Sequence, residues 1–224
     1  MAAPSQSNLK PKKPLTPFII YLMGFFAIWT AWVLFVYPRI VRIGDRTLAY
    51  ALVNIAFRLF LWVIPVFAYL RYIDRVNAVA YFKLKQYWKR GVLIGLGISV
   101  LNFFGTMARV GVPHPTMHNI TWNSILSTSI LIGLFEEIPF RGFILQKLEE
   151  RTGFWMANLI SSLLFLAIHF PGWISLHLLT AQIVIAVFIL GVVFAILFHY
   201  SKSLWSAIVA HSLNDFISAV VFHL

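Results

Sequence analysis

Two adjacent glutamates inside an apolar segment are the first residues of this sequence that could do chemistry. The stretch LFEEIPFRGFILQ (134–146) places Glu136 and Glu137 ahead of Pro139 and Arg141. An ionisable side chain near the centre of a bilayer costs about 2.5–3.5 kcal/mol, so it usually faces a protein interior or a water-filled cavity. A carboxylate in such a cavity can take a proton from water and return it, which is the acid–base chemistry that amide hydrolysis needs.

The spacing of these residues predicts different roles for the two acids. Glu137 and Arg141 are four positions apart, so they share one helix face in the order that favours an ion pair. Glu136 lies about 100° away around the helix and has no such local partner. Pro139 lacks an N–H and crowds the preceding turn, which predicts a kink beside the acids. We expect Glu137 and Arg141 to support the site and Glu136 to be free for chemistry.

Histidine and carboxylate side chains occur at comparable depth in two later apolar segments. One contains His169, and the other contains His211, Asn214 and Asp215. At 1.5 Å per residue, Glu136 lies roughly 18 Å from the inner end of its helix, His169 roughly 22 Å, and His211 and Asp215 roughly 12 and 18 Å. Helix tilt can absorb this spread of about 10 Å. The sequence therefore predicts that two acids and two histidines from three helices converge.

Two further residues have structural interpretations. Arg58 lies one turn from Asn54 in another apolar segment, and we expect it to neutralise a buried acid. Phe165 lies one turn before His169 and is expected to wall the site by packing.

The residues alone leave two hydrolytic chemistries open. In one, a carboxylate and a histidine activate water, and other groups stabilise the oxyanion, without a metal. In the other, Glu136, His169 and His211 bind a divalent metal such as Zn²⁺ and leave a coordination position open for water. We favour the reaction that requires no cofactor.

The composition decides which kind of element must position these residues. The chain has 224 residues, of which 60% are hydrophobic and only 11% are charged, whereas soluble domains carry roughly 25% charged residues. A transmembrane helix needs about 20 apolar residues, so we predict an all-α membrane bundle of about seven helices, with six to eight allowed by the length. The predicted helices cover 17–37, 47–70, 91–110, 122–148, 154–170, 176–199 and 203–222.

Residues 17–224 are expected to form one transmembrane domain whose motif-bearing core covers 122–222. Residues 1–16 are basic and rich in proline, and are expected to form a disordered tail. The net charge of +11 lies mostly in loops beside apolar segments, as in cytoplasmic membrane flanks, and the longest such loop is 71–91. This pattern favours a cytoplasmic N-terminus and makes nucleic acid an improbable partner. The chain has no cysteine, which excludes disulfides and cysteine nucleophiles.

Three motifs in the C-terminal half resemble those of the CPBP family, the CAAX prenyl endopeptidase and bacteriocin-processing (Abi) intramembrane proteases. The motif EExxxR is met by residues 136–141, FxxxH by 165–169 and HxxxN/D by 211–215. The similarity covers about 80 residues, and its strength comes from all three motifs occurring in order on consecutive apolar helices.

This resemblance implies cleavage of a membrane-embedded or membrane-associated peptide or protein. Glu136 and His169 would activate the attacking water, and His211 with the last motif residue would stabilise the oxyanion. The family is often labelled metalloprotease, although the eukaryotic member is described as working through glutamate without metal. Where eukaryotic CAAX endopeptidases have asparagine last, this chain has Asp215, with Asn214 before it. Because a charged aspartate cannot donate to an oxyanion, Asp215 would instead orient His211, be protonated or bind metal, and Asn214 could serve as the donor in its place.

Two other functions remain open at this level. Buried acids and histidines also build proton relays, so a proton-coupled transporter is one alternative. A non-catalytic bacteriocin-immunity or regulatory protein is the other. The short loops favour a bacterial cell membrane, where peptide pheromones, bacteriocins or membrane proteins would be substrates.

Overall fold

The protein is an all-helical membrane bundle, as the composition predicts. The computed structural model describes residues 14–44, 46–113 and 120–222, and this part of the chain contains helices and connecting turns but no strand. Six of its helices are long and apolar enough to cross a membrane. They are Thr16–Ile40, Leu48–Asp74, Trp88–Val110, Phe154–Ser175, Ala181–Ser201 and Trp205–Phe222. Large apolar side chains such as Met23, Leu93 and Leu101 are exposed on them, as expected for surfaces that face lipid. The chain is therefore an integral, multi-pass membrane protein.

The first half of the chain forms three long helical rods. The first contains α1 (Thr16–Ala31), η1 (Trp32–Val36), α2 (Tyr37–Ile40) and η2 (Val41–Ile43), and the second contains α3 (Leu48–Arg58), η3 (Leu59–Val63), α4 (Ile64–Ala68) and η4 (Tyr69–Asp74). A short helix, α5 (Ala78–Tyr81), leads to the third, α6 (Trp88–Val110).

The second half carries the three motifs. Its elements are η6 (Asn123–Ile130), α7 (Ile132–Glu137), η7 (Ile138–Leu145), α8 (Gln146–Thr152), α9 (Phe154–Ala167), α10 (Phe170–Ser175), α11 (Ala181–Ser201), α12 (Trp205–Phe216) and η8 (Ile217–Phe222). Thr180 caps α11 by accepting a hydrogen bond from the Ile183 amide, and Gly153, at φ 78°, makes the sharp turn between α8 and α9.

Proline explains where three of the helices widen into π-helical turns. The π-helical segments η1 and η3 each end shortly before a proline, Pro38 or Pro65, and Pro139 is the second residue of η7. A proline ring clashes with the carbonyl of the preceding turn and cannot donate to it, and a π-turn is one way for a helix to accommodate this. The kink predicted at Pro139 therefore takes the form of a π-helical segment directly after the two glutamates.

Two predicted helix boundaries are wrong. The expected helix 122–148 is interrupted by a turn at Leu131 and continues to Thr152, so it is not among the six long apolar helices. The expected helix 176–199 begins only at Ala181, because α10 and the turn after it occupy the preceding residues. The predicted disordered tail, 1–16, lies outside the described residues up to position 13, and α1 already begins at Thr16.

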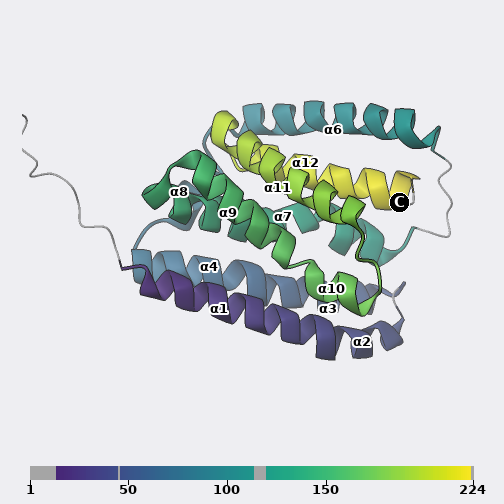
Figure 1. Cartoon of the computed structure of the whole chain (residues 1–224), viewed down its shortest axis with the longest axis horizontal. Coiled ribbons are helices and arrows are strands. Elements are labelled where there is room, and N and C mark those ends of the chain that lie inside the picture. Colours follow the sequence, from purple (N-terminus) through teal and green to yellow (C-terminus); the bar gives the residue numbers. More distant parts are fainter. Residues whose placement is uncertain (1–13, 45, 114–119, 223–224) are drawn as a thin grey trace, which may run out of the picture.

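Figure 1 shows how the bundle encloses its motif-bearing segment. The helix α1 and the rod α3–η4 lie along one edge, α6 lies along the opposite edge, and α7, α8 and α9 lie between them. Aromatic side chains connect the layers: Trp62 of η3 packs edge-to-face against Phe25 of α1, with ring centroids 5.4 Å apart, and against Phe140 of η7, at 6.2 Å. This cluster holds η7, and with it the glutamates, in the interior.

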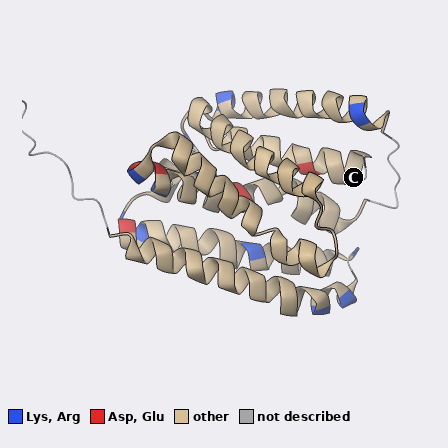
Figure 2. Ribbon diagram, viewed as in Figure 1, with Lys and Arg blue, Asp and Glu red and all other residues tan. Residues whose placement is uncertain are grey.

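Charged residues gather near the ends of the helices, and few lie in the middle of the bundle (Figure 2). Arg58 and Asp215, which lie midway along their long helices, are exceptions. So are Glu136, Glu137 and Arg141 in α7 and η7, whose exposed fractions are only 6%, 0% and 1%. Charges this well buried need partners within the protein.

Candidate active site

Glu137 holds the polar centre together. Its Oε1 atom accepts a hydrogen bond from Nη1 of Arg141 at 2.9 Å and another from Nδ1 of His211 at 2.7 Å. The Arg141–Glu137 pair expected from the four-residue spacing is therefore present, and it extends to a second helix, α12. Arg141 also donates from Nη2 to the Gly191 carbonyl of α11 at 2.8 Å. One carboxylate and one guanidinium thus join η7, α11 and α12.

The bond to Glu137 orients the His211 ring. An ionised carboxylate only accepts hydrogen bonds, so Nδ1 of His211 carries the hydrogen and Nε2 points to the other side. Nε2 lies 3.8 Å from Oε2 of Glu136 and 3.7 Å from Oδ2 of Asp215. Phe194 stacks on the ring, with centroids 4.9 Å apart and planes 19° apart. Glu137 and Phe194 thus hold the imidazole ring, and its Nε2 atom faces the carboxylates of Glu136 and Asp215.

His169 is positioned by the end of α9. The backbone N–H of His169 bonds to the Leu166 carbonyl at 3.1 Å, which leaves the Phe165 carbonyl without its helical donor. The Nδ1 atom of His169 donates to that carbonyl at 2.9 Å, and its Nε2 is then the unprotonated ring nitrogen of the neutral form. The Nε1 atom of Trp29, on α1, donates to the neighbouring Ile168 carbonyl at 2.7 Å. The helix end thus fixes the tautomer of a site histidine.

Phe165 contributes its ring as well as its carbonyl. The Arg141 guanidinium lies over the ring at 4.2 Å from the centroid, and the ring packs edge-to-face against His169 at 5.1 Å. It therefore walls the site, as its position one turn before His169 predicts, and it also helps to hold a buried positive charge.

Asp215 and Asn214 take different places. Asp215 lines the same cavity as Glu136 and His169, whereas the side-chain oxygen of Asn214 accepts a hydrogen bond from Asn102 of α6 at 3.2 Å. The Asn214 amide in turn donates to Oδ1 of Asp215 at 3.0 Å. Asn214 is thus behind Asp215, and Asp215 is the member of the pair that faces the site.

A cavity of about 470 Å³ brings the polar residues together. Glu136, His169, His211 and Asp215 line it, and so does Arg58, which donates to the Ser127 carbonyl at 3.3 Å. Arg58 was expected to neutralise a buried acid. It makes no close ion pair with a carboxylate of the described residues, but its positive charge acts on Glu136 and Asp215 from the cavity wall. Most of the remaining lining is apolar and comes from Trp29, Val33, Ile132, Phe165, Ile168, Trp173, Leu176, Leu178, Val187 and Leu190.

A glycine allows the two motif-bearing helices to approach. A Cβ atom at Gly133 would lie 2.4 Å from the Ile208 carbonyl oxygen and 2.5 Å from Oγ of Ser212, so only glycine fits at this contact between α7 and α12. Glu136 follows less than one turn later, and His211 lies beside Ser212. The close approach therefore sets the distance between the acid and the imidazole.

The alternative chemistry with a bound metal ion requires at least three ligands that converge on one point. Among the described residues, no three His, Asp or Glu side chains are arranged to hold such an ion, and this includes the alternative ligand set Glu136, His169 and His211.

Several residues that shape the site carry no distinguishing signal in the sequence. Trp29 and Phe194 contact its histidines or their helix ends, and Gly191 supplies a carbonyl to Arg141. These residues lie in continuously apolar helices, where a functional aromatic residue or carbonyl resembles its neighbours. The indole N–H of Trp29, a donor that needs a partner when buried, is the one feature that could have pointed to them.

Comparison with known proteins finds two matches. Residues 118–217 match the family model described as "Type II CAAX prenyl endopeptidase Rce1-like". The chain is also 37% identical over 94 residues to "Putative membrane peptidase YdiL" of Bacillus subtilis (strain 168), a match that covers 42% of this chain and 35% of that protein. The chain thus spans about a third of the length of this relative. No solved structure matches the chain. The matched segment contains all three motifs and much of the wall of the polar cavity that they form, and over this segment the chain is similar to CAAX-type membrane peptidases.

Proposed function

We propose that the chain is an intramembrane endopeptidase that hydrolyses a peptide bond of a membrane-associated peptide or protein. The observation that carries this proposal is the position of the Glu136 carboxylate, 3.8 Å from the His211 imidazole, on the wall of a cavity that His169 also lines. Amide hydrolysis requires a base that activates water, a donor that stabilises the oxyanion, and space for the water and the peptide group.

Glu136 is the general base of the proposed reaction. It takes one proton from a water molecule in the cavity while the oxygen of that water bonds to the carbonyl carbon of the scissile amide. His169 orients the same water by accepting a hydrogen bond at Nε2, since its Nδ1–H is occupied by the Phe165 carbonyl. Both groups are held by short helical segments, so the water is placed without large rearrangement.

His211 stabilises the oxyanion. In the proposed mechanism it acts as an imidazolium whose Nε2–H donates to the negatively charged oxygen, while Glu137 balances the ring from the Nδ1 side. Arg58, on the cavity wall, adds a second positive charge. The protonated Glu136 then gives its proton to the amide nitrogen and the carbon–nitrogen bond breaks, so the water is divided between the new carboxyl group and the new amine.

The cavity walls and the site chemistry suggest the class of substrate and the cofactor requirement. Because most of the lining is apolar, the residues that flank the scissile bond are apolar side chains able to leave the lipid phase. No metal has a role in the proposed reaction. We further propose a bacterial cell membrane with a cytoplasmic N-terminus, on the distribution of lysine and arginine between loops.

The test uses the full chain in liposomes with a panel of membrane-associated peptides, whose products are identified by mass spectrometry. Wild type should cleave at least one peptide, and Glu136→Ala, His169→Ala and His211→Ala should each lose roughly 10²–10⁴-fold in rate. Glu149→Ala is the matched control, because Glu149 lies outside the cavity and pairs with His199 at 3.2 Å. Equal cleavage by wild type and all three site variants would refute the proposal, and ion flux without cleavage would favour the transporter.

A further inference from the structure

A second, larger cavity is separate from the proposed protease site. It has a volume of about 770 Å³ and is formed where η4 ends and the chain turns into α5. Among the described residues, none lines both this cavity and the one around Glu136. Because the helix Leu48–Asp74 ends here, the cavity lies at the boundary between the membrane and water.

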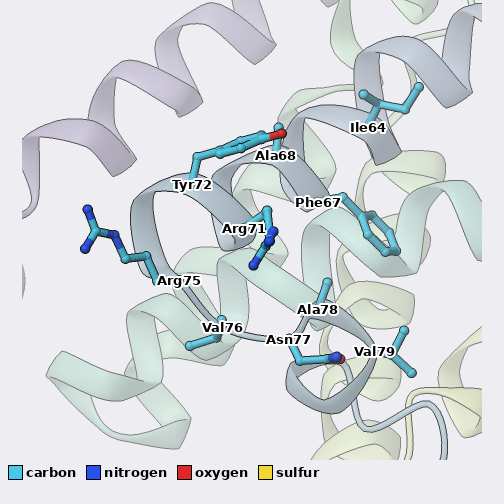
Figure 3. A pocket seen from close by; sticks show the side chains of 10 residues that line it. All are labelled: Ile64, Phe67, Ala68, Arg71, Tyr72, Arg75, Val76, Asn77, Ala78 and Val79. Carbon is cyan, nitrogen blue, oxygen red and sulfur yellow. The ribbon is translucent and has the colours of Figure 1, made fainter.

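The cavity is basic at one end and apolar at the other. Figure 3 shows Arg71 pointing into the space between η4 and the following segment, Arg75 extending outwards from the same helix end, and Phe67 and Val79 on the opposite side. Ile64 lies seven residues before Arg71, which is about 10 Å deeper along the helix. The cavity therefore changes from basic at the membrane surface to apolar deeper in the bilayer.

The arginines of this cavity are available to a ligand. Both are exposed, and none of the ten lining residues in the described part of the chain is acidic. The nearest acid in sequence, Asp74, is buried and forms an ion pair with Lys147 at 2.6 Å. A neighbouring cavity, which shares Asn77 and Val79, is lined by Lys83 and Lys85.

The walls of the cavity are preformed. Arg75 adopts a left-handed conformation, with φ 58°, and the Val76 amide donates to the Leu70 carbonyl at 2.9 Å, which closes the end of η4. Asn77 then caps α5 by accepting a hydrogen bond from the Ala80 amide at 3.0 Å. A ligand would meet this turn without first having to order it.

We propose that this cavity binds an anionic phospholipid of the surrounding leaflet. The Arg71 guanidinium, which points into the cavity, matches the geometry of a phosphate and binds it more specifically than an ammonium group does. Arg75 adds a second positive charge at the same helix end. The acyl chain lies against Ile64, Phe67 and Ala68, which continue the lipid-facing surface of the helix. A soluble phosphate would use only the basic end, so the apolar half of the cavity identifies the lipid as the ligand.

The test is native mass spectrometry of the full chain in a neutral detergent, titrated with phosphatidylglycerol and phosphatidylcholine of identical acyl chains. Wild type should prefer phosphatidylglycerol. The variant Arg71→Gln/Arg75→Gln should lose roughly 25-fold in that preference, about fivefold per arginine. The matched control is Arg42→Gln/Arg109→Gln. It removes two exposed charges, one just after the helix Thr16–Ile40 and one at the end of α6, and should keep the preference for phosphatidylglycerol.

A second variant separates the cavity from general surface charge. Ala68→Trp fills the apolar half and keeps both arginines, and it should also weaken phosphatidylglycerol binding several-fold. The proposal is overturned if wild type shows no preference, if the control loses as much as the arginine variant, or if Ala68→Trp binds like wild type. It is also overturned if inorganic phosphate displaces the lipid completely at millimolar concentration, because the ligand would then be a free anion.

Discussion

The Glu137 carboxylate accepts a hydrogen bond of 2.7 Å from Nδ1 of His211, a residue 74 positions further along the chain. The same oxygen accepts a hydrogen bond from Arg141. Glu137 therefore fixes the orientation of the imidazole ring and turns its Nε2 atom towards the cavity. The neighbouring acid, Glu136, faces that nitrogen from the other side. Two adjacent glutamates thus have different partners, and their substitution should have different effects.

Replacement of Glu136 by glutamine should remove activity without removing the fold. Glutamine has the same shape but cannot take a proton from water, so cleavage should fall by roughly 10²–10⁴-fold. Glu136 takes part in none of the bonds that join η7, α11 and α12, so the melting temperature should stay within a few degrees. Product formation and thermal unfolding in the same detergent measure the two effects. A glutamine variant that retains more than a tenth of wild-type cleavage would contradict the role of Glu136 as the base.

Replacement of Glu137 by glutamine should mainly remove stability. The change leaves the buried Arg141 guanidinium without its counter-charge, which typically costs about 3–5 kcal/mol. For a chain of this size the melting temperature should fall by roughly 10 °C. The double variant Glu137→Gln/Arg141→Gln should lose less than the sum of the two single variants, because each single change strands the other charge. Additive losses would show that the two side chains are not coupled.

Substitutions of Asp215 should lower the catalytic rate more than substitutions of Asn214. Asp215 lines the cavity, so Asp215→Ala should lower the catalytic rate by about tenfold or more, whereas Asp215→Asn keeps the shape, supplies an N–H donor and should retain most activity. Asn214 holds Asp215 from behind, so Asn214→Ala should have the smaller effect. Rates at saturating substrate distinguish these variants. A larger loss for Asn214→Ala than for Asp215→Ala would reverse the assignment.

A methyl group at Gly133 should increase the separation of α7 and α12 at the proposed site. The added Cβ would overlap the backbone of α12 at Ile208, so Gly133→Ala should lower both the melting temperature and cleavage. Gly97→Ala is the matched control, because Gly97 is an exposed helical glycine with nothing within 4 Å of the added carbon, and alanine favours helices there. Equal stability of the two alanine variants would show that the contact between α7 and α12 is not close in solution.

Chelation should leave the proposed reaction intact. The described histidines and acids do not form a group of three that could hold a metal ion, and Glu136 is proposed to activate water directly. Cleavage in EDTA or phenanthroline should therefore equal cleavage in buffer alone. Loss of activity that zinc restores would assign the reaction to a bound metal instead.

The sequence by itself determined the environment and the set of candidate residues. An apolar chain with few charges had to become a membrane bundle, because backbone polar groups in lipid are satisfied within helices. Depth along each helix follows from counting residues, and this count alone assigns Glu136, His169, His211 and Asp215 to one layer of the membrane. The pair Glu137–Arg141 followed from four-residue spacing, because each residue lies one turn from the other along the same helical segment.

Only the tertiary structure decided how those helices are rotated and how closely they approach. Spacing fixes which residues share a face of one helix but not which face meets another helix. The bond between Glu137 and His211, the choice between Asn214 and Asp215, and the place of Arg58 on the cavity wall all depend on that rotation. The interruption at Leu131 was likewise not predicted, because neither proline nor glycine lies at that position to mark it. Apolar residues are favourable in lipid wherever they lie on a helix, so hydrophobicity identifies the segments that enter the membrane but not their contacts. Steric fit at positions such as Gly133 decides which helix faces pack together.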